Sequence, residues 1–479
     1  MSWRSCGTAI ADVDGRRGAV GMRAGFFSLL GVVTSGGFRF LVNLVIGRVA
    51  GPAVLAQTAS ILSLAQISTL LGPSSLGAAM TRNISVARTT GPPGEADRIR
   101  AHVWRMLWVR ALWIAPLALG AYAVVYRPSV TAVAVLLPVL VSLGVYQVAK
   151  AELLGDFAFR KVAVIEVAGV VVGVASLVAL VVSGVRDARL LLPVVVSGVI
   201  FVVARGRVRR PEARLPVEKQ RELREFVRLG IVGTLVSAGF MHVSVLLAVH
   251  VGGEVGGGMY VAAFTLATPL AMFTTAMGSV VLPHLSALAT RHGERLLRAL
   301  PMSQLMAWSV GSLLGLVMLF SDEVVALVWG AAYAESADLY PLVLGAICMT
   351  AIGMPTSIAL TAAGNDGMRI SARLGALGAC TGAIVWLLTV SGLDVTGVAV
   401  GYLTAATVTS VAPLFFVHRL AGKRMHVRRL WPWGWGALLI AAGLLREQFS
   451  AVTVFGIASV LVVAAVLGSA GGVRRLRGV

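Results

Sequence analysis

Apolar runs of about twenty residues recur along the whole chain, separated by short polar turns. A helix that crosses the ~30 Å hydrocarbon core of a bilayer needs about 20 predominantly apolar residues. Hydrophobic residues make up 57% of the 479 residues and charged residues only 13%, whereas soluble domains carry roughly 25% charged residues. The sequence therefore predicts an all-α polytopic membrane protein rather than a soluble multi-domain enzyme.

The run criterion predicts about fourteen transmembrane helices. Their approximate ranges are 24–47, 53–72, 103–125, 130–149, 162–183, 189–204, 228–250, 258–281, 301–320, 340–363, 371–392, 396–417, 432–445 and 451–470. Residues 1–23 include Asp12 and Asp14 and have no continuous apolar core before a cleavage site. We therefore expect them to form a cytoplasmic tail and not a cleaved signal peptide.

Basic residues are distributed unequally between the two sets of turns that these helices define. If the N-terminus is cytoplasmic, 34 of the 41 Lys and Arg residues fall on the inner side and five on the outer side. Inner loops of membrane proteins carry such an excess. Turns rich in basic residues and turns poor in them alternate along the whole chain. The pattern predicts a bacterial-type plasma (inner) membrane protein with both termini in the cytoplasm.

The formal net charge of +20 follows from the same pattern. Basic residues near a membrane surface are attracted to anionic lipid headgroups, so anionic membrane lipids are expected partners. Binding to nucleic acid is not expected, because the basic residues are spread over many short loops without aromatic residues interleaved for stacking.

A polar, basic stretch divides the chain into two parts. We expect residues 205–227 to form a cytoplasmic linker that ends in a short amphipathic helix. A shift of 201 residues aligns the segment at 76–87 with the segment at 277–289, and this similarity suggests an internal repeat of the kind typical of transporters. The expected organisation is an N-lobe of six helices at 24–204, a C-lobe of six helices at 228–418, and two further helices with a basic tail at 419–479.

Two segments at corresponding positions of this repeat resemble a known superfamily. "IGRVAGPAVLAQTASILSLAQISTLLGPSSLGAAMTRNISVAR" (46–88) resembles the opening signature of polysaccharide flippases, with these residues at the pattern positions: Arg48, Gly51, Pro52, Gly72, Gly77 and Arg82. "GGGMYVAAFTLATPLAMFTTAMGSVVLPHLSALA" (256–289) resembles their Gly-x-Tyr-x-x-Ala helix and the Leu-Pro-x-Leu-Ser that follows. The chain is thus similar to the polysaccharide and lipid-linked oligosaccharide flippases of the multidrug/oligosaccharidyl-lipid/polysaccharide exporter superfamily.

The resemblance implies two lobes around a central cavity and transport by alternating access. It also implies the substrate class, a glycan joined by a diphosphate to a polyprenyl lipid, such as a polysaccharide repeat unit or a cell-wall precursor. Coupling to H⁺ or Na⁺ and cooperation with a polysaccharide polymerase or glycosyltransferase would fit this role. A cation-coupled multidrug exporter of the same superfamily and a non-transporting scaffold for envelope assembly are the alternatives.

Arg39 is a charged residue inside the first predicted helix. A charge at the centre of a membrane helix costs ~2.5–3.5 kcal/mol on insertion scales, and such residues commonly face a cavity or a partner. Ser35, Arg39 and Asn43 follow one another at intervals of four and so share one helical face. Because a guanidinium can bind phosphate through two parallel hydrogen bonds, Arg39 is a candidate for the substrate diphosphate. Snorkelling towards the outer interface is the alternative.

Other polar residues are weaker candidates. Gln57 and Gln66 could contact sugar hydroxyls or bond neighbouring helices, and His242, in the middle of the seventh predicted helix, could relay protons or serve the structure alone. Arg48 and Arg82, at the two ends of the first helix pair, could bind the diphosphate at the exit and the entrance or anchor the helices at the interface. Arg110, just inside the third predicted helix, is expected to snorkel.

Motifs for other chemistry are missing. Cys6, Cys348 and Cys380 have no metal-ligand spacing, and the sequence contains no Gly-x-x-x-x-Gly-Lys-Ser/Thr motif for ATP. We therefore expect no metal and no cofactor. No external loop is long enough for a glycosyltransferase or polymerase domain, so an enzyme is not expected.

Overall fold

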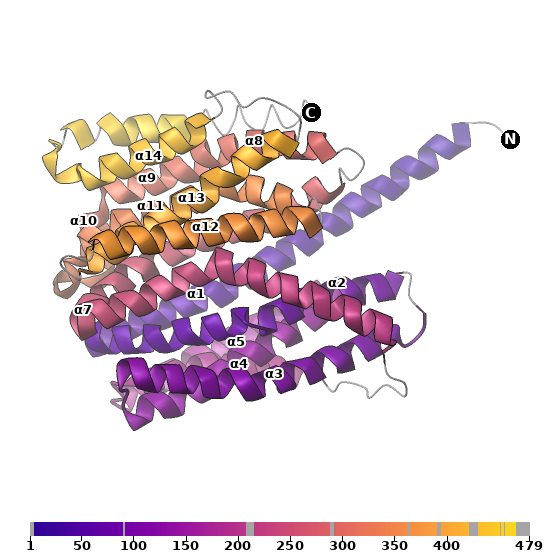
Figure 1. The fold of residues 1–479 in the computed structure, drawn as a ribbon, viewed down its shortest axis with the longest axis horizontal. Helices are drawn as coiled ribbons and strands as arrows, with labels where there is room; N and C mark the ends of the chain where they lie inside the picture. The colour runs from indigo at the N-terminus through magenta and orange to yellow at the C-terminus, as the bar shows by residue number, and fades with distance from the viewer. Residues whose placement is uncertain are drawn as a thin grey trace.

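The computed structural model describes residues 4–89, 92–206, 215–287, 292–362, 365–389, 394–420, 430–450, 452–454 and 456–465. All regular secondary structure in these ranges is helical. Most of the helices run roughly along one direction and pack side by side (Figure 1). The predicted all-α fold is therefore confirmed. Part of the predicted C-terminal region, residues 421–429 and 466–479, lies outside the described ranges.

The first half of the chain forms six α-helices. They are α1 (Arg4–Leu70), α2 (Pro73–Thr89), α3 (Glu95–Tyr126), α4 (Val130–Gly155), α5 (Phe159–Val182) and α6 (Leu192–Arg205), with the 3-10 turn η1 (Ala188–Leu191) before α6. Helix α4 begins where the Ser129 side chain accepts a hydrogen bond from the amide of Ala132. This cap satisfies one of the free donors at the start of the helix.

The second half forms α7 (Val217–Ala287), α8 (His292–Met306), α9 (Ser312–Leu319), α10 (Ser321–Trp329), α11 (Ser336–Ala362), α12 (Asn365–Thr389), α13 (Val395–Leu420) and α14 (Trp431–Leu444). A π-helical turn, η2 (Ala307–Gly311), joins α8 to α9. The 3-10 turns η3 (Ala331–Tyr333) and η6 (Arg446–Gln448) follow α10 and α14.

Helices α1 and α7 are each interrupted by one glycine. Gly51 has φ 86° and Gly253 has φ 63°, a backbone conformation that L side chains rarely adopt. The chain reverses direction at each glycine. At Gly253, a Cβ added to Gly257 would lie 2.6 Å from the Cα atom of Val249. Each helix is therefore a hairpin, and the two turns lie 202 positions apart, close to the offset of the predicted repeat.

Ten helices in the described ranges are long and apolar enough to cross a membrane, so the predicted number of fourteen is not confirmed. Two of the ten, Val33–Leu70 and Ala238–Pro269, contain the glycine turns and so include two predicted segments each. Helix α14, of 14 residues, and the apolar helix Val452–Ala465 fall below the length that a span requires.

Helix α2 was not expected, because the sequence analysis treated its residues as part of a basic inner loop. Its residues are amphipathic and not uniformly apolar, so a search for apolar runs misses them. Leu76, Ala79 and Met80 are fully buried and pack in a cluster that includes residues of α3 and α4. Tertiary packing of this face stabilises α2, as it does most helices in proteins.

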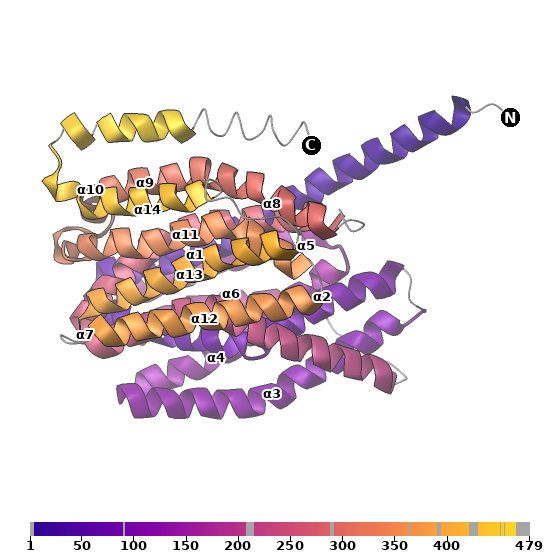
Figure 2. The ribbon, with the colours of Figure 1, turned by 45° about the horizontal axis from the view of Figure 1, so that its top comes forward.

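The two ends of the bundle differ in charge. One end, on the right in Figures 1 and 2, holds the end of α2, the start of α3 and the start of α7. We call it the basic end, because Arg82, Arg88, Arg98, Arg221 and Arg224 lie in these segments. The other end, called the opposite end here, holds Gly51, Gly253 and the turn between α3 and α4.

The start of α7 is the amphipathic helix predicted for the end of the linker. It continues directly into the membrane segment instead of forming a separate element. Leu223 and Val227 are buried in the same cluster as residues of α2, α3 and α4. This packing attaches the second half of the chain to the first at the basic end.

Arg446 fastens the end of α14 to α10 and α11 at the opposite end. Its guanidinium donates to both carboxylate oxygens of Asp322, at 2.8 and 3.0 Å, and to Asp338 at 2.9 Å. The Arg446 side chain is 5% exposed. Hydrogen bonds from Arg446 hold the pKa of Asp322 below its usual value. A carboxylate with a lowered pKa in the folded state stabilises the fold above its unfolded pKa, and the contribution is lost as the pH falls through the folded pKa.

Replacing Asp322 with Asn should therefore lower the melting temperature of the purified protein at neutral pH. The expected loss is about 1–2 kcal/mol, less than the 3–5 kcal/mol of a fully buried pair, because Asp322 is partly exposed. Thermal unfolding in detergent measures the effect, and the difference from the parent should shrink at acidic pH. Glu323→Gln, one residue away, is the control. Equal effects of the two substitutions would contradict a specific role for the Asp322 pair.

Candidate functional site

A cavity of about 540 Å³ lies between α1, α2, α4, α7 and α11. Its size falls in the range of small-molecule sites. Asn43, Val261 and Ile347 line one part of the cavity wall. Thr81 of α2 and Leu154 of α4 line the part nearer the basic end. Both hairpins contribute, and residues at equal distances before and after Gly51 face it from α1: Asn43 with Ala59, and Arg39 with Ser63.

Five of the candidate residues line this cavity. They are Ser35, Arg39, Asn43 and Gln66 from α1, and His242 from α7. The first three share one face of α1, as their spacing predicted. Gln57, Arg48 and Arg82 do not line the cavity.

Arg39 is half-buried and forms no hydrogen bond or ion pair with any residue in the described ranges. It borders the large cavity and a smaller one of about 30 Å³ that extends towards α5 and α6. Across the cavity, the Asn43 amide nitrogen lies 3.5 Å from the Thr265 hydroxyl, and the Asn43 carbonyl oxygen is buried without a partner. Arg39 and Asn43 therefore present unused hydrogen-bonding capacity at the cavity wall.

A second basic residue of the cavity, Lys150, was missed by the sequence analysis. Its ammonium group lies 2.8 Å from a carboxylate oxygen of Glu166 and 3.0 Å from the Tyr146 hydroxyl, which also donates to Glu166. Tyr146 and Glu166 are buried. Lys150 was counted among the basic residues of an inner loop, and only the packing of α5 on α4 brings Glu166 to it.

The lining of the large cavity includes the basic side chains of Arg39 and Lys150 and the imidazole of His242. No Asp or Glu is among the lining residues that the structure describes. Glu166 contacts Lys150 from behind, at the smaller cavity. The charge of the lining thus favours an anionic ligand over a cationic one.

The opposite end of the cavity is closed by contacts between the two halves of the chain. The Arg48 guanidinium donates to the carbonyl oxygens of Val328 at 2.6 Å and Leu327 at 2.7 Å, at the end of α10. The Tyr333 hydroxyl donates to the carbonyl oxygen of Gly47 at 2.9 Å. The structure therefore places Arg48 in this closure.

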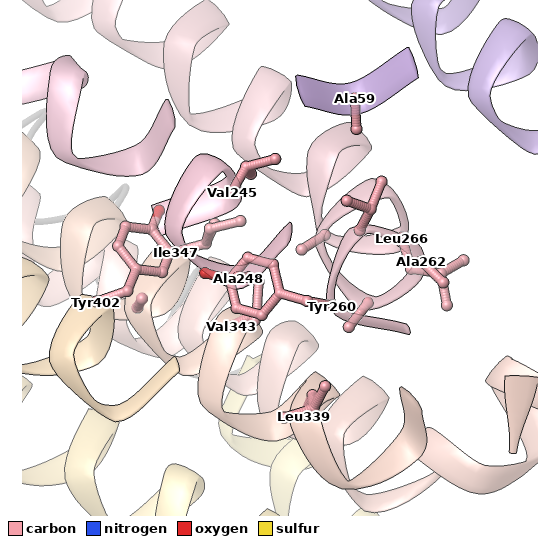
Figure 3. Close-up of a cluster of buried hydrophobic side chains, with 14 of the residues drawn as sticks. Ala59, Val245, Ala248, Tyr260, Ala262, Leu266, Leu339, Val343, Ile347 and Tyr402 are labelled. Carbon is pink, nitrogen blue, oxygen red and sulfur yellow. The ribbon is translucent and has the colours of Figure 1, made fainter. Parts of the chain in front are cut away.

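A buried apolar cluster formed by residues of α1, α7, α11 and α13 adjoins the cavity (Figure 3). Val245 and Ile347 belong both to the cluster and to the cavity wall. The Tyr260 ring of α7 points towards Tyr402 of α13 in this cluster, and the Tyr260 hydroxyl donates to Ser244 at 2.9 Å. Among the described residues, this tight packing bounds the cavity on the side of the opposite end. The cavity therefore extends towards the basic end.

Arg82 and Gln57 lie away from the cavity. The Arg82 guanidinium stands 5.1 Å from the centre of the Phe226 ring at the basic end, a cation–π contact between α2 and α7. Gln57 is half-buried in α1, and its backbone carbonyl accepts a hydrogen bond from Ser60. Neither position contacts the other candidates.

Ion pairs hold the first-half helices together at the basic end. Glu152 of α4 accepts from Arg205 of α6 at 2.5 Å and from the indole nitrogen of Trp104 of α3 at 3.1 Å. Arg100 of α3 pairs with Glu152 and with Asp156. Because these residues connect helices of one half of the chain, they allow that half to move as a unit.

The fold is similar to that of solved transporters of the multidrug/oligosaccharidyl-lipid/polysaccharide exporter superfamily. A solved structure of the lipid II flippase MurJ, in an inward closed conformation, superposes with a TM-score of 0.65 at 12% identity, covering 94% of this chain and 99% of that one. A MATE structure in complex with MaL6 gives a TM-score of 0.61 at 16% identity, covering 83% and 96%. A transporter of this superfamily from Pyrococcus furiosus gives 0.59 at 15% identity, covering 88% and 96%.

Residues 101–338 match the family described as polysaccharide biosynthesis protein. This match and the shared fold agree with the resemblance found in the sequence, and the ten apolar helices support a multi-pass membrane protein. None of the curated protein sequences matches the chain.

Proposed function

We propose that the protein flips a polyprenyl-diphosphate-linked glycan across the membrane, from the leaflet at the basic end to the leaflet at the opposite end. The observation that carries the proposal is the cavity, in which Arg39 has no hydrogen-bond partner among the described residues, Lys150 and His242 add nitrogen donors, and no described lining residue is a carboxylate. A diphosphate needs such a lining, because charge-assisted hydrogen bonds replace its hydration. Transport of this kind changes no covalent bond, so no enzymatic role is proposed.

Alternating access would work through the two closures. In the proposed cycle, the first half of the chain (24–204) and the second half (228–418) act as lobes around the cavity. The headgroup enters from the basic end while Arg48 and Tyr333 hold the opposite end shut. The lobes then separate at that end and close at the basic end. The lipid tail stays in the bilayer throughout.

A cation-coupled multidrug exporter is the second candidate, since the fold is shared with MATE transporters. A cationic drug would require an acidic group at the cavity surface, and among the described residues that line the two cavities the only carboxylate, Glu166, is paired with Lys150. This pairing favours the flippase. A scaffold that assembles envelope enzymes, with a polymerase or glycosyltransferase as partner, would retain the fold without transport.

Reconstitution of the purified protein distinguishes these three functions. In liposomes that carry a fluorescent polyprenyl-diphosphate disaccharide, an external quencher reaches only the molecules in the outer leaflet. If the protein flips the lipid, the fluorescence of the inner-leaflet molecules should be quenched faster in proteoliposomes than in protein-free liposomes. Uptake of a cationic dye without lipid flipping would favour the exporter, and neither activity would favour the scaffold. Transport rates of the parent and of His242→Gln at several pH values test proton coupling. If the pH dependence of transport is the same in both, His242 has a structural role.

The proposed orientation has the basic end in the cytoplasm of a bacterial-type plasma membrane, with both termini on that side. Its basis is the unequal distribution of basic residues between the two sets of turns. Reporter fusions after residues 127, 186 and 254 should read external, and fusions after residues 90, 215 and 425 should read internal. Inversion of two or more of them would contradict the orientation.

A further inference from the structure

A second arginine inside a predicted span, Arg110 of α3, has a buried guanidinium nitrogen with no hydrogen-bond partner in the part of the chain that the structure describes. It faces a small pocket on the outside of the bundle, separate from the transport cavity. The pocket lies where the end of α1 and Pro73 meet α3 and α4. A buried guanidinium nitrogen left unpaired is costly, so this position calls for a ligand.

The surroundings of Arg110 are otherwise apolar. Leu107, Ile114 and Val141 line the pocket. Gly72 leaves the room that the arginine occupies, since a Cβ on Gly72 would lie 3.2 Å from the Arg110 Cδ atom. Ser68 and Thr69 also line the pocket, but their hydroxyls donate to carbonyl groups of their own helix. The pocket therefore combines one cationic donor with walls suited to hydrocarbon.

The depth of Arg110 matches the headgroup boundary. A ~30 Å hydrocarbon core takes about 20 helical residues, and counting back from Tyr126 at the opposite end of α3 places its other edge near Met106. Side chains of a helix lean towards its N-terminus, which for α3 is the basic end. The Arg110 guanidinium can thus reach the level of lipid phosphates by snorkelling.

The face of α3 beside the pocket is exposed. Trp108 is 51% exposed and Trp113 is 78% exposed. Tryptophan is enriched at the interface between hydrocarbon and headgroups. A ligand can therefore reach Arg110 from the lipid phase without passing through the protein.

We infer that Arg110 and this pocket bind an anionic phospholipid of the leaflet at the basic end, with the phosphate on the guanidinium and an acyl chain along the groove between α3 and α4. The planar guanidinium fits a phosphate through two parallel hydrogen bonds. The bound lipid would brace α3 and α4 against the end of α1, the part of the hairpin that carries Gln66 into the transport cavity. The site is independent of which substrate the cavity takes.

Titration of the purified, delipidated full chain with phosphatidylglycerol in a mild detergent tests the site. Thermal unfolding should show stabilisation that saturates with lipid, and native mass spectrometry should show retained phosphatidylglycerol. Arg110→Gln should weaken the apparent affinity about tenfold or more, the effect expected when one charge-assisted contact is lost. Arg110→Lys should bind phosphatidylglycerol with an affinity between those of the parent and Arg110→Gln. Arg105 is an exposed arginine on the same helix, so Arg105→Gln should bind the lipid as the parent does.

Gly72→Ala provides a second route to the same result. Its methyl group would displace the Arg110 side chain while the charge is kept, and it should also weaken lipid binding. Equal affinities of Arg110→Gln and Arg105→Gln for phosphatidylglycerol would overturn the inference. So would inorganic phosphate that stabilises the parent as well as the lipid does, because the ligand would then be a free anion and not a lipid.

Discussion

Arg39→Ala should reduce flipping of the lipid-linked substrate at least tenfold while the protein still inserts and folds. The guanidinium faces the cavity without a partner in the described ranges, so its charge is available to the diphosphate. Hydrogen bonds to charged groups contribute about 1.5–3 kcal/mol, which corresponds to roughly 10-fold to 150-fold in affinity. Insertion should not suffer, because removing a charge from a membrane helix makes insertion easier.

Arg39→Lys should retain part of the activity, since the ammonium keeps the charge but loses the planar geometry for two parallel bonds. Initial flipping rates in proteoliposomes, at equal amounts of reconstituted protein, measure both variants. Gln57→Ala is the matched control on the same hairpin, because Gln57 does not line the cavity. Parental flipping by Arg39→Ala would assign Arg39 a structural role.

Gly258→Ala should abolish transport by preventing closure of the opposite end. A Cβ on Gly258 of α7 would lie 2.4 Å from the carbonyl oxygen of Pro52 in α1. Backbone atoms cannot move aside cheaply, so the two hairpins cannot meet as they do here. The protein should then favour states that are open at the opposite end, and the cycle should stall.

Spectroscopic distances between labels across the opposite end measure this shift, together with flipping rates. Labels near Gly51 and Gly253 should be further apart in Gly258→Ala than in the parent. Gly233→Ala, on the same helix, is the control because a Cβ there meets no atom within 4 Å. Unchanged distances and parental flipping in Gly258→Ala would show that this contact does not gate the cavity.

Much of the cavity was predictable from the first helix alone. Ser35, Arg39 and Asn43 share a face because helical periodicity places residues four apart one above another, and that face does line the cavity. Gln57 and Gln66 lie nine positions apart, which at 3.6 residues per turn places them on opposite sides of the helix. Gln66 lines the cavity and Gln57 does not.

Contacts between distant helices were not predictable. The Lys150 and Glu166 pair depends on how α5 packs against α4 after a turn, and the role of Arg48 depends on where α10 ends. Positive charge outside the apolar runs was taken as anchoring, which is the common reason for basic residues at those positions. Helix α2 was missed because only one face of this amphipathic helix is buried, so its sequence contains no continuous apolar run.

The sequence by itself determined that this chain is a helical membrane protein and which helices carry polar faces, and it predicted a repeat that relates the two halves. Those properties are local, since hydropathy and periodicity along one helix reflect the burial of that helix. Tertiary structure alone decided that Arg39 lacks a partner among the described residues while Lys150 has one, that Arg48 contacts α10 at the opposite end, and that Arg110 faces an outer pocket. Each of these depends on which side chains of other helices lie within hydrogen-bonding distance, and residues such as Arg48 and Val328 meet across 280 positions of the chain.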